Sequence, residues 1–195
     1  MEVKIGENNE ILLRGKTITT GYYKKPEATA AAIDRDGWFH TGDAGYLKDS
    51  HLYLTERIKD LFKTSNGKYI SPQALETKLA IDRYIDQIAV IADERKFVSA
   101  LIVPVYGFVK DYAKEKGIAY SNMDELLQHP KIQALFRARI DTLQQQFAHY
   151  EQVKRFTLLT EPFSMERGEL TNTLKLKRSV VAKNYKGLID KMYEE

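Results

Sequence analysis

Two apolar runs that lie close together in the chain constrain its fold more than any other feature. Residues 88–92 read Ile-Ala-Val-Ile-Ala, and residues 98–105 read Val-Ser-Ala-Leu-Ile-Val-Pro-Val. Short runs rich in β-branched residues favour buried strands. The charged segment between them, residues 93–96, suits a turn. We therefore expect two adjacent buried strands at the centre of a core.

Helical patterns surround these strands. A third strand is expected at residues 155–160, and Ser179 is a predicted N-cap for a closing helix whose apolar stripe contains Leu188. Helices are predicted over residues 72–80, 108–116, 123–147 with a restart at Pro130, and 179–193. Residues 57–195 are thus expected to form a small α+β or α/β domain of helices packed on a short sheet.

Residues 1–56 have a different, β-rich pattern. A strand is predicted at residues 10–14, a short helix at 26–33, and a β-hairpin from the apolar segments 44–47 and 52–55. These are too few strands to close a sheet, so their edges are expected to pair with further polypeptide. This piece is expected to be the least stable region.

The composition argues against several classes of protein. The chain of 195 residues carries 30 basic and 27 acidic side chains, interspersed, for a net charge of only +3, which argues against a nucleic-acid-binding surface. No apolar run approaches the roughly 20 residues of a transmembrane helix. The chain has no cysteine, which excludes disulfides and thiolate metal sites and favours a cytoplasmic location. The histidines show no metal-ligand spacing, so no metal site is predicted.

Three motifs follow one another along the chain: GWFHTGD at residues 37–43, ERIKD at 56–60 and LTNTLKLKR at 170–178. With a GEIL-like stretch at residues 9–12, GYYKKPEAT, DERKFVSALIVP and YEQVKRFTLL, they resemble the carboxyl-terminal third of the AMP-binding, acyl-adenylate-forming ligases, closest to the long-chain fatty-acyl-CoA synthetases. The resemblance covers nearly the whole sequence. It implies that residues 1–56 are a remnant of the large N-terminal domain and residues 57–195 the mobile C-terminal lid.

The resemblance assigns nucleotide binding to the first two motifs. Asp43, after Thr41, would accept hydrogen bonds from both ribose hydroxyls, which suits an ionised carboxylate. Arg57 would bind ribose or phosphate oxygens through its planar, permanently charged guanidinium. A Gly-Asp pair outside such a motif would more simply be explained as part of a turn, with no role in ligand binding. The surrounding motif favours the nucleotide role.

Two lysines carry further roles that the resemblance implies. Lys59 matches the hinge about which the lid swings, a role that depends on backbone torsion rather than on the side chain. Lys175 matches the adenylation lysine, whose ammonium would neutralise charge on the carboxylate and the α-phosphate together. Lys177 stays an alternative, because an extended segment would let either lysine reach the cleft.

The segment Ser65-Asn66-Gly67-Lys68 is predicted to join two short strands in a hairpin turn. The resemblance implies in addition that it faces the tunnel for the pantetheine arm of coenzyme A. Gly67 would leave that tunnel unobstructed, and Lys68 would pair with a phosphate. Glu76, in the next helix, is interpreted as structural.

The resulting hypothesis is a C-terminal fragment of an ATP-dependent long-chain fatty acid:CoA ligase. Its cofactors would be ATP/AMP and coenzyme A, with Mg²⁺ in the full-length enzyme and no ligand for it here, and the parent could associate peripherally with a membrane. The sequence lacks the Ser/Thr/Gly-rich loop that holds the triphosphate in these ligases, so the isolated chain is expected to be inactive and to need the missing N-terminal domain. Two alternatives stay open: a ligase for an aryl, short-chain or amino acid, and a non-catalytic module that binds a nucleotide or a partner protein.

Overall fold

The computed structural model describes residues 1–194, apart from the side chain of Glu56. The chain divides into two compact units, one of residues 1–61 and one that begins at Phe62. The change of sequence pattern had placed this boundary after residue 56, five residues earlier.

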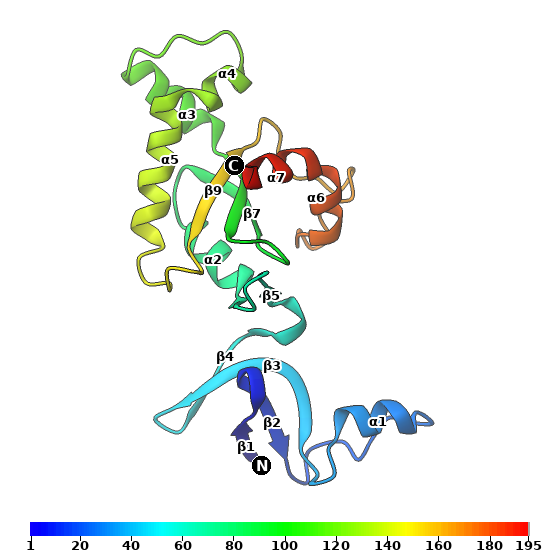
Figure 1. Cartoon of the computed structure of the whole chain (residues 1–195). Helices are drawn as coiled ribbons and strands as arrows, with labels where there is room; N and C mark the ends of the chain where they lie inside the picture. The colour runs from blue at the N-terminus through cyan, green and yellow to red at the C-terminus, as the bar shows by residue number, and fades with distance from the viewer. Residues whose placement is uncertain (195) are drawn as a thin grey trace. The chain divides into compact units, whose positions relative to one another are not determined.

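The first unit is a four-stranded antiparallel sheet in the order β1-β2-β3-β4 (Figure 1). The predicted strand at 10–14, helix at 26–33 and hairpin of 44–47 with 52–55 are confirmed, whereas β1 was not predicted. Its elements are β1 (Glu2–Ile5), the 3₁₀ helix η1 (Glu7–Asn9), β2 (Glu10–Arg14), α1 (Pro26–Ala32), β3 (Phe39–Lys48), β4 (His51–Arg57) and the 3₁₀ helix η2 (Ile58–Asp60).

The β3–β4 hairpin follows from local chemistry. Its two turn residues, Asp49 and Ser50, both have positive φ, of 48° and 61°. This is the left-handed pair that matches the twist of the flanking strands in a two-residue loop. Across the strands, the rings of Tyr46 and Tyr53 stack at a centroid distance of 5.0 Å, which helps to set the register.

The second unit is built on a mixed sheet in the order β7-β8-β9. Strands β7 (Ile85–Ile91) and β8 (Val98–Pro104) are antiparallel neighbours, as predicted, and β9 (Val153–Leu158) lies parallel to β8. A parallel pair needs a long crossover. Three helices supply it: α3 (Tyr106–Glu115), α4 (Met123–Gln128) and α5 (Pro130–Leu143). The predicted restart at Pro130 is confirmed, and the mixed α+β class agrees with the sequence.

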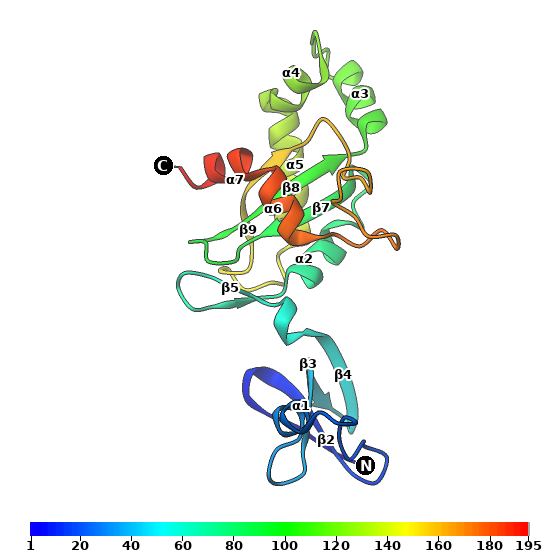
Figure 2. The same cartoon turned by 90° about the vertical axis from the view of Figure 1, so that its right-hand side faces the viewer.

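Helices cover both faces of this sheet (Figures 1 and 2). Ala100 and Ile102 of β8 belong to one buried cluster, together with residues of α2 (Pro72–Leu79) and α5. Leu101 and Val103 belong to a second cluster with residues of α6 (Arg178–Asn184) and α7 (Lys186–Tyr193). All four side chains are fully buried. Burial of each Ile, Leu or Val side chain stabilises the fold by about 1.5–3 kcal/mol. Because both faces of β8 are buried, the strand is apolar at consecutive positions rather than at alternate ones.

A short hairpin, β5 (Phe62–Lys63) and β6 (Tyr69–Ile70), precedes α2. Both the hairpin and the helix start at Pro72 were predicted. Ser71 caps the helix, since its Oγ accepts a hydrogen bond of 3.1 Å from the backbone N–H of Ala74.

The prediction of one closing helix is wrong. Two helices, α6 (Arg178–Asn184) and α7 (Lys186–Tyr193), meet at Tyr185, whose φ of −105° and ψ of 17° leave the helical region. The Tyr185 ring packs edge-on against Phe163 at 5.7 Å. The break changes the buried face of α7, so that Ile189 is buried and Leu188 is 37% exposed. The N-cap is Lys177, not Ser179.

No helix in residues 1–194 is both long enough and apolar enough to span a bilayer.

Candidate functional site

The predicted nucleotide-binding segment is a bulge in β3. Pairing of β2 with β3 places Glu10 opposite Ala44 and Leu12 opposite His40. One residue separates the two positions on β2, whereas residues 41–43 separate them on β3. The extra residues leave the ladder, which is how a bulge redirects side chains at a sheet.

Contacts with β2 hold the bulge. The Thr41 hydroxyl donates to the carbonyl oxygen of Ile11 at 2.7 Å and accepts from the Asp43 N–H at 3.1 Å. The N–H of Gly42, a residue with φ of 69°, donates to Oε1 of Glu10 at 3.0 Å. The proton of the Thr41 hydroxyl is therefore engaged within the protein, so toward a ligand this hydroxyl can act only as an acceptor. Sequence reasoning did not single out Glu10.

Asp43 and Arg57 face each other across β3 and β4. They are paired in the strand register, and Arg57 Nε lies 3.1 Å from Asp43 Oδ1. The side chains are 27% and 58% exposed for Asp43 and Arg57, respectively. An ion pair this accessible contributes little to stability, which leaves the carboxylate and the guanidinium available to a ligand.

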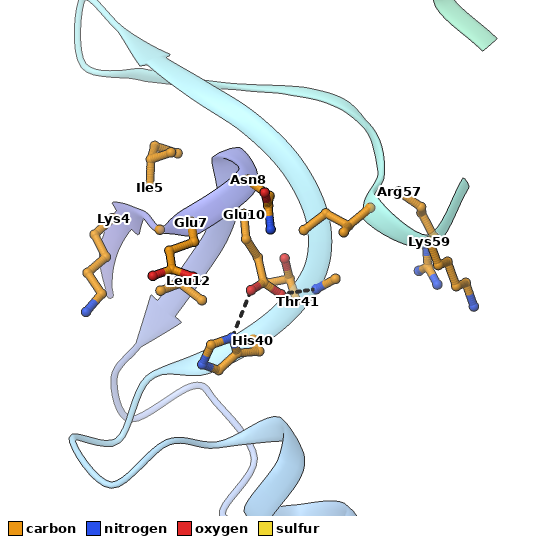
Figure 3. Close-up of a pocket in the computed structure, with 13 residues that line it drawn as sticks. Lys4, Ile5, Glu7, Asn8, Glu10, Leu12, His40, Thr41, Arg57 and Lys59 are labelled. Carbon is orange, nitrogen blue, oxygen red and sulfur yellow. Dashed lines mark hydrogen bonds and ion pairs between the residues drawn. The ribbon is translucent and has the colours of Figure 1, made fainter. Parts of the chain in front are cut away.

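A cavity of about 720 Å³ opens beside the bulge (Figure 3). Its walls come from β1, η1, β2, the start of the bulge, the end of β4 and η2, and they include Thr41, Arg57 and Lys59. Asp43 does not line it. The volume is in the range of small-molecule sites. Within the described residues, no group of three acidic, histidine or cysteine side chains could hold a metal ion.

Lys59 is an exposed residue in the single 3₁₀ turn η2. The first unit ends two residues later, at Leu61. At its end, the Leu61 N–H donates a hydrogen bond of 3.2 Å to the Ile58 carbonyl oxygen. So short a turn can open at little cost.

Lys175 lies in a tight loop of the second unit. Its carbonyl oxygen accepts a hydrogen bond of 2.8 Å from the Thr171 N–H, and its N–H donates one of 3.0 Å to the Thr171 hydroxyl. Leu174, just before it, has φ of 60°, a conformation that costs a non-glycine residue about 1 kcal/mol. Lys175 and Lys177 are both exposed, while Leu176 between them packs against the second core cluster. The choice between the two lysines thus stays open.

An ion pair ties this loop to the helix α2. Arg178 donates to both carboxylate oxygens of Glu76, at 2.6 and 2.7 Å, and Glu76 also accepts from the Val90 N–H at 2.8 Å. Two parallel charge-assisted bonds fix position as well as distance. These contacts agree with the structural interpretation of Glu76.

Glu169 is a buried carboxylate at the base of the same loop, 1% exposed. Burial opposes its ionisation, but hydrogen bonds from Arg167, Asn184 and the Ser164 N–H outweigh that cost and lower its pKa below the usual 4.5. Glu169 was not predicted, because its partners assemble only when the loop folds over α6.

Replacing Glu169 with glutamine is expected to lower the free energy of unfolding by about 1–3 kcal/mol at neutral pH, since the buried amide cannot accept all of these bonds. A carboxylate with a lowered pKa in the folded state stabilises above its unfolded pKa, and the contribution is lost as the pH falls through the folded value. The gap between wild type and variant should therefore narrow below about pH 4.5, measured by urea unfolding.

The matched control is Glu161→Gln, whose side chain is 73% exposed and pairs with the same arginine. It should change stability by less than about 0.5 kcal/mol. Equal effects of the two substitutions would contradict the role assigned to Glu169.

Gly67 and Lys68 lie in the predicted hairpin turn between β5 and β6. Gly67 has φ of 73°, and its N–H donates to the Thr64 carbonyl oxygen at 2.8 Å. The Lys68 ammonium lies 5.5 Å from the ring centre of Tyr150. The Asn-Gly turn is confirmed, and the coenzyme A contact stays a prediction.

A family model for the C-terminal domain of AMP-binding enzymes matches residues 59–195. Among curated proteins, the chain is 37% identical over 190 residues to the peroxisomal long chain acyl-CoA synthetase 7 of Arabidopsis thaliana, covering 95% of the chain and 27% of the relative. It is 35% identical over 197 residues to the long-chain-fatty-acid–CoA ligase 5 of Rattus norvegicus, with coverage of 97% and 28%. The chain thus spans less than a third of these relatives.

The fold also matches solved structures. One is the A domain of the carboxylic acid reductase from Segniliparus rugosus in complex with AMP and a co-purified carboxylic acid, with 25% identity and a TM-score of 0.70. The alignment covers 94% of this chain and 28% of that structure.

Proposed function

The chain belongs to the family of C-terminal domains of AMP-binding enzymes, and we propose that it is the C-terminal portion of an ATP-dependent long-chain fatty acid:CoA ligase. The curated relatives named above are long-chain acyl-CoA synthetases, which supports this substrate class over aryl, short-chain or amino acids. The acyl pocket, the triphosphate loop and the Mg²⁺ site would belong to the rest of such an enzyme.

The reaction would proceed in two steps. The fatty acid carboxylate attacks the α-phosphorus of ATP and releases pyrophosphate, and the thiol of coenzyme A then attacks the acyl carbon and releases AMP. Both transition states develop negative charge, but in different places. A lid that changes position between the steps would present different groups to each.

The single observation that carries this proposal is the bulge of β3, which presents the Asp43 carboxylate opposite Arg57 at 3.1 Å. Two acceptor oxygens can bind the two hydroxyls of a ribose, and the arginine beside them can bind a phosphate or ribose oxygen. Thr41 would accept from the ligand. The first unit thus holds the nucleoside, and residues 1–56 would be the end of the large domain.

The second unit would supply the mobile groups. Lys175 would reach the reacting carboxylate and α-phosphate during adenylation, from a loop held by the bond between Arg178 and Glu76. Rotation at Lys59 would then bring Gly67 and Lys68 to the arriving coenzyme A.

Asp43→Asn is the test of this proposal. In the full-length ligase it is expected to raise the KM for ATP about 10-fold or more, because a charged acceptor of hydrogen bonds is lost. It should affect 2′-deoxy-ATP less, since that nucleotide offers one hydroxyl fewer. Kinetics of ATP–pyrophosphate exchange with both nucleotides measure this. An unchanged KM and an unchanged preference for ATP would refute the nucleotide role.

A further inference from the structure

We infer that Glu10 is a positioning residue for the nucleotide site: it holds the bulge in the shape that presents Asp43 to the ribose. The inference deepens the proposed function and rests on it. Glu10 itself would not contact the reacting atoms.

The geometry of Glu10 differs from that of an ordinary surface carboxylate. Its side chain is only 18% exposed. One oxygen, Oε2, lies 2.8 Å from Nδ1 of His40, and the other, Oε1, accepts from the Gly42 N–H at 3.0 Å. Figure 3 shows both contacts as dashed lines that converge on one side chain. One carboxylate thereby holds two points of the segment just before Asp43.

The bulge creates the need for this carboxylate. Residues 41–43 have left the ladder between β2 and β3, so no residue of β2 lies opposite Gly42 in the strand register, and its φ of 69° turns the chain. A side chain from β2 replaces the missing carbonyl acceptor. Gly42 is half-buried, and backbone N–H groups shielded from water seldom go without a partner. Here the partner is a side chain anchored in a regular strand.

A second, independent contact starts from β2 as well. Thr41 donates to the Ile11 carbonyl oxygen, and its own oxygen receives the Asp43 N–H. Glu10 and Ile11 of β2 thus hold Thr41 and Gly42 of the bulge directly, and Thr41 in turn holds the Asp43 N–H. Removal of Glu10 leaves the Thr41 contact in place, so we expect the fold to persist while the Asp43 carboxylate loses its defined position.

The tautomer of His40 determines which of the two Glu10 contacts a glutamine at position 10 can keep. The Glu10 carboxylate can only accept, so Nδ1 of His40 donates in this contact. A glutamine amide offers one acceptor and one donor group. It can keep the Gly42 contact through its oxygen and donate to Nδ1 if His40 adopts the other tautomer. Glu10→Gln should therefore retain much of the function that Glu10→Ala loses.

The experiment compares variants of the full-length ligase by kcat/KM for ATP and for 2′-deoxy-ATP in pyrophosphate exchange. Asp43→Asn is expected to reduce the preference for ATP about 10-fold, Glu10→Ala about 3- to 10-fold, and Glu10→Gln about 2-fold or less. The double variant Glu10→Ala/Asp43→Asn should show no further loss of preference beyond Asp43→Asn, because both act through one carboxylate.

The matched control is Glu27→Gln, an exposed carboxylate on α1 in the same unit. It should leave the preference unchanged. A merely structural role of Glu10 would lower kcat/KM for both nucleotides equally and leave their ratio intact, and that result overturns the inference. Should Glu10→Ala not accumulate as folded protein, Glu10→Asp, whose shorter reach cannot make both contacts, is measured instead with the same expected loss.

The outcomes separate the two claims. If Asp43→Asn reduces the preference for ATP over 2′-deoxy-ATP and the Glu10 variants do not, the positioning role of Glu10 fails and the proposed function stands. If Asp43→Asn leaves the preference unchanged, the nucleotide role fails, and the inference about Glu10 fails with it.

Discussion

Replacing Lys175 with alanine is expected to slow adenylate formation about 10²-fold or more, with thioester formation from a supplied acyl adenylate spared. The physical reason is electrostatic: an ammonium at the α-phosphate stabilises charge that develops only in the first transition state. Single-turnover measurements of the two half-reactions in the full-length enzyme test this directly.

Lys177→Ala is the matched control, because the two lysines are exposed on either side of the partly buried Leu176. It should retain adenylation within about 3-fold of wild type. If Lys177→Ala instead carries the large loss, the motif register is wrong by two residues. Equal loss of both half-reactions in Lys175→Ala would contradict a role confined to adenylation.

Lys59→Pro is expected to block thioester formation while adenylation stays largely intact. Proline restricts φ at its own position and disfavours the helical region for the preceding residue, Ile58. Both effects oppose a change of backbone torsion in η2. The two half-reactions should therefore separate by about 10-fold or more when each is measured alone.

Lys59→Ala tests whether the backbone or the side chain matters. It removes the exposed ammonium but leaves the torsions free, so both steps should continue at near the wild-type rate. A comparable loss of thioester formation in Lys59→Ala would assign the effect to the side chain. Equal loss of both steps in Lys59→Pro would indicate misfolding and contradict the hinge.

Much of the second unit could be predicted because its signals are local. The apolar runs that became β7 and β8 have no polar face, and a strand buried on both sides needs none. Pro72 and Pro130 mark helix starts because their fixed φ suits the first turn. The break at Tyr185 had no such marker. The helical spacing continued through it, and packing against Phe163 overrode the pattern.

The candidate site was predicted in part. Motif resemblance pointed to Asp43 and Arg57, and the strand register does bring them together. It gave no role to Glu10 or Glu169, since the partners of each carboxylate are contributed by other elements or a folded loop. The nucleotide, adenylation and coenzyme A roles stay predictions, as does the hinge role of Lys59; the residues concerned are Thr41, Asp43, Arg57, Lys175, Gly67 and Lys68.

By itself, the sequence determined most of the elements, the two buried strands, the Asn-Gly turn and the family, because hydrophobic period, proline and motif order are properties of neighbouring residues. Only the tertiary structure decided that β3 bulges at residues 41–43 and that Glu10 closes the gap. A bulge depends on how two strands pair, and a buried carboxylate is stable only where donors from separate segments meet it. Neither condition can be read from neighbours along the chain.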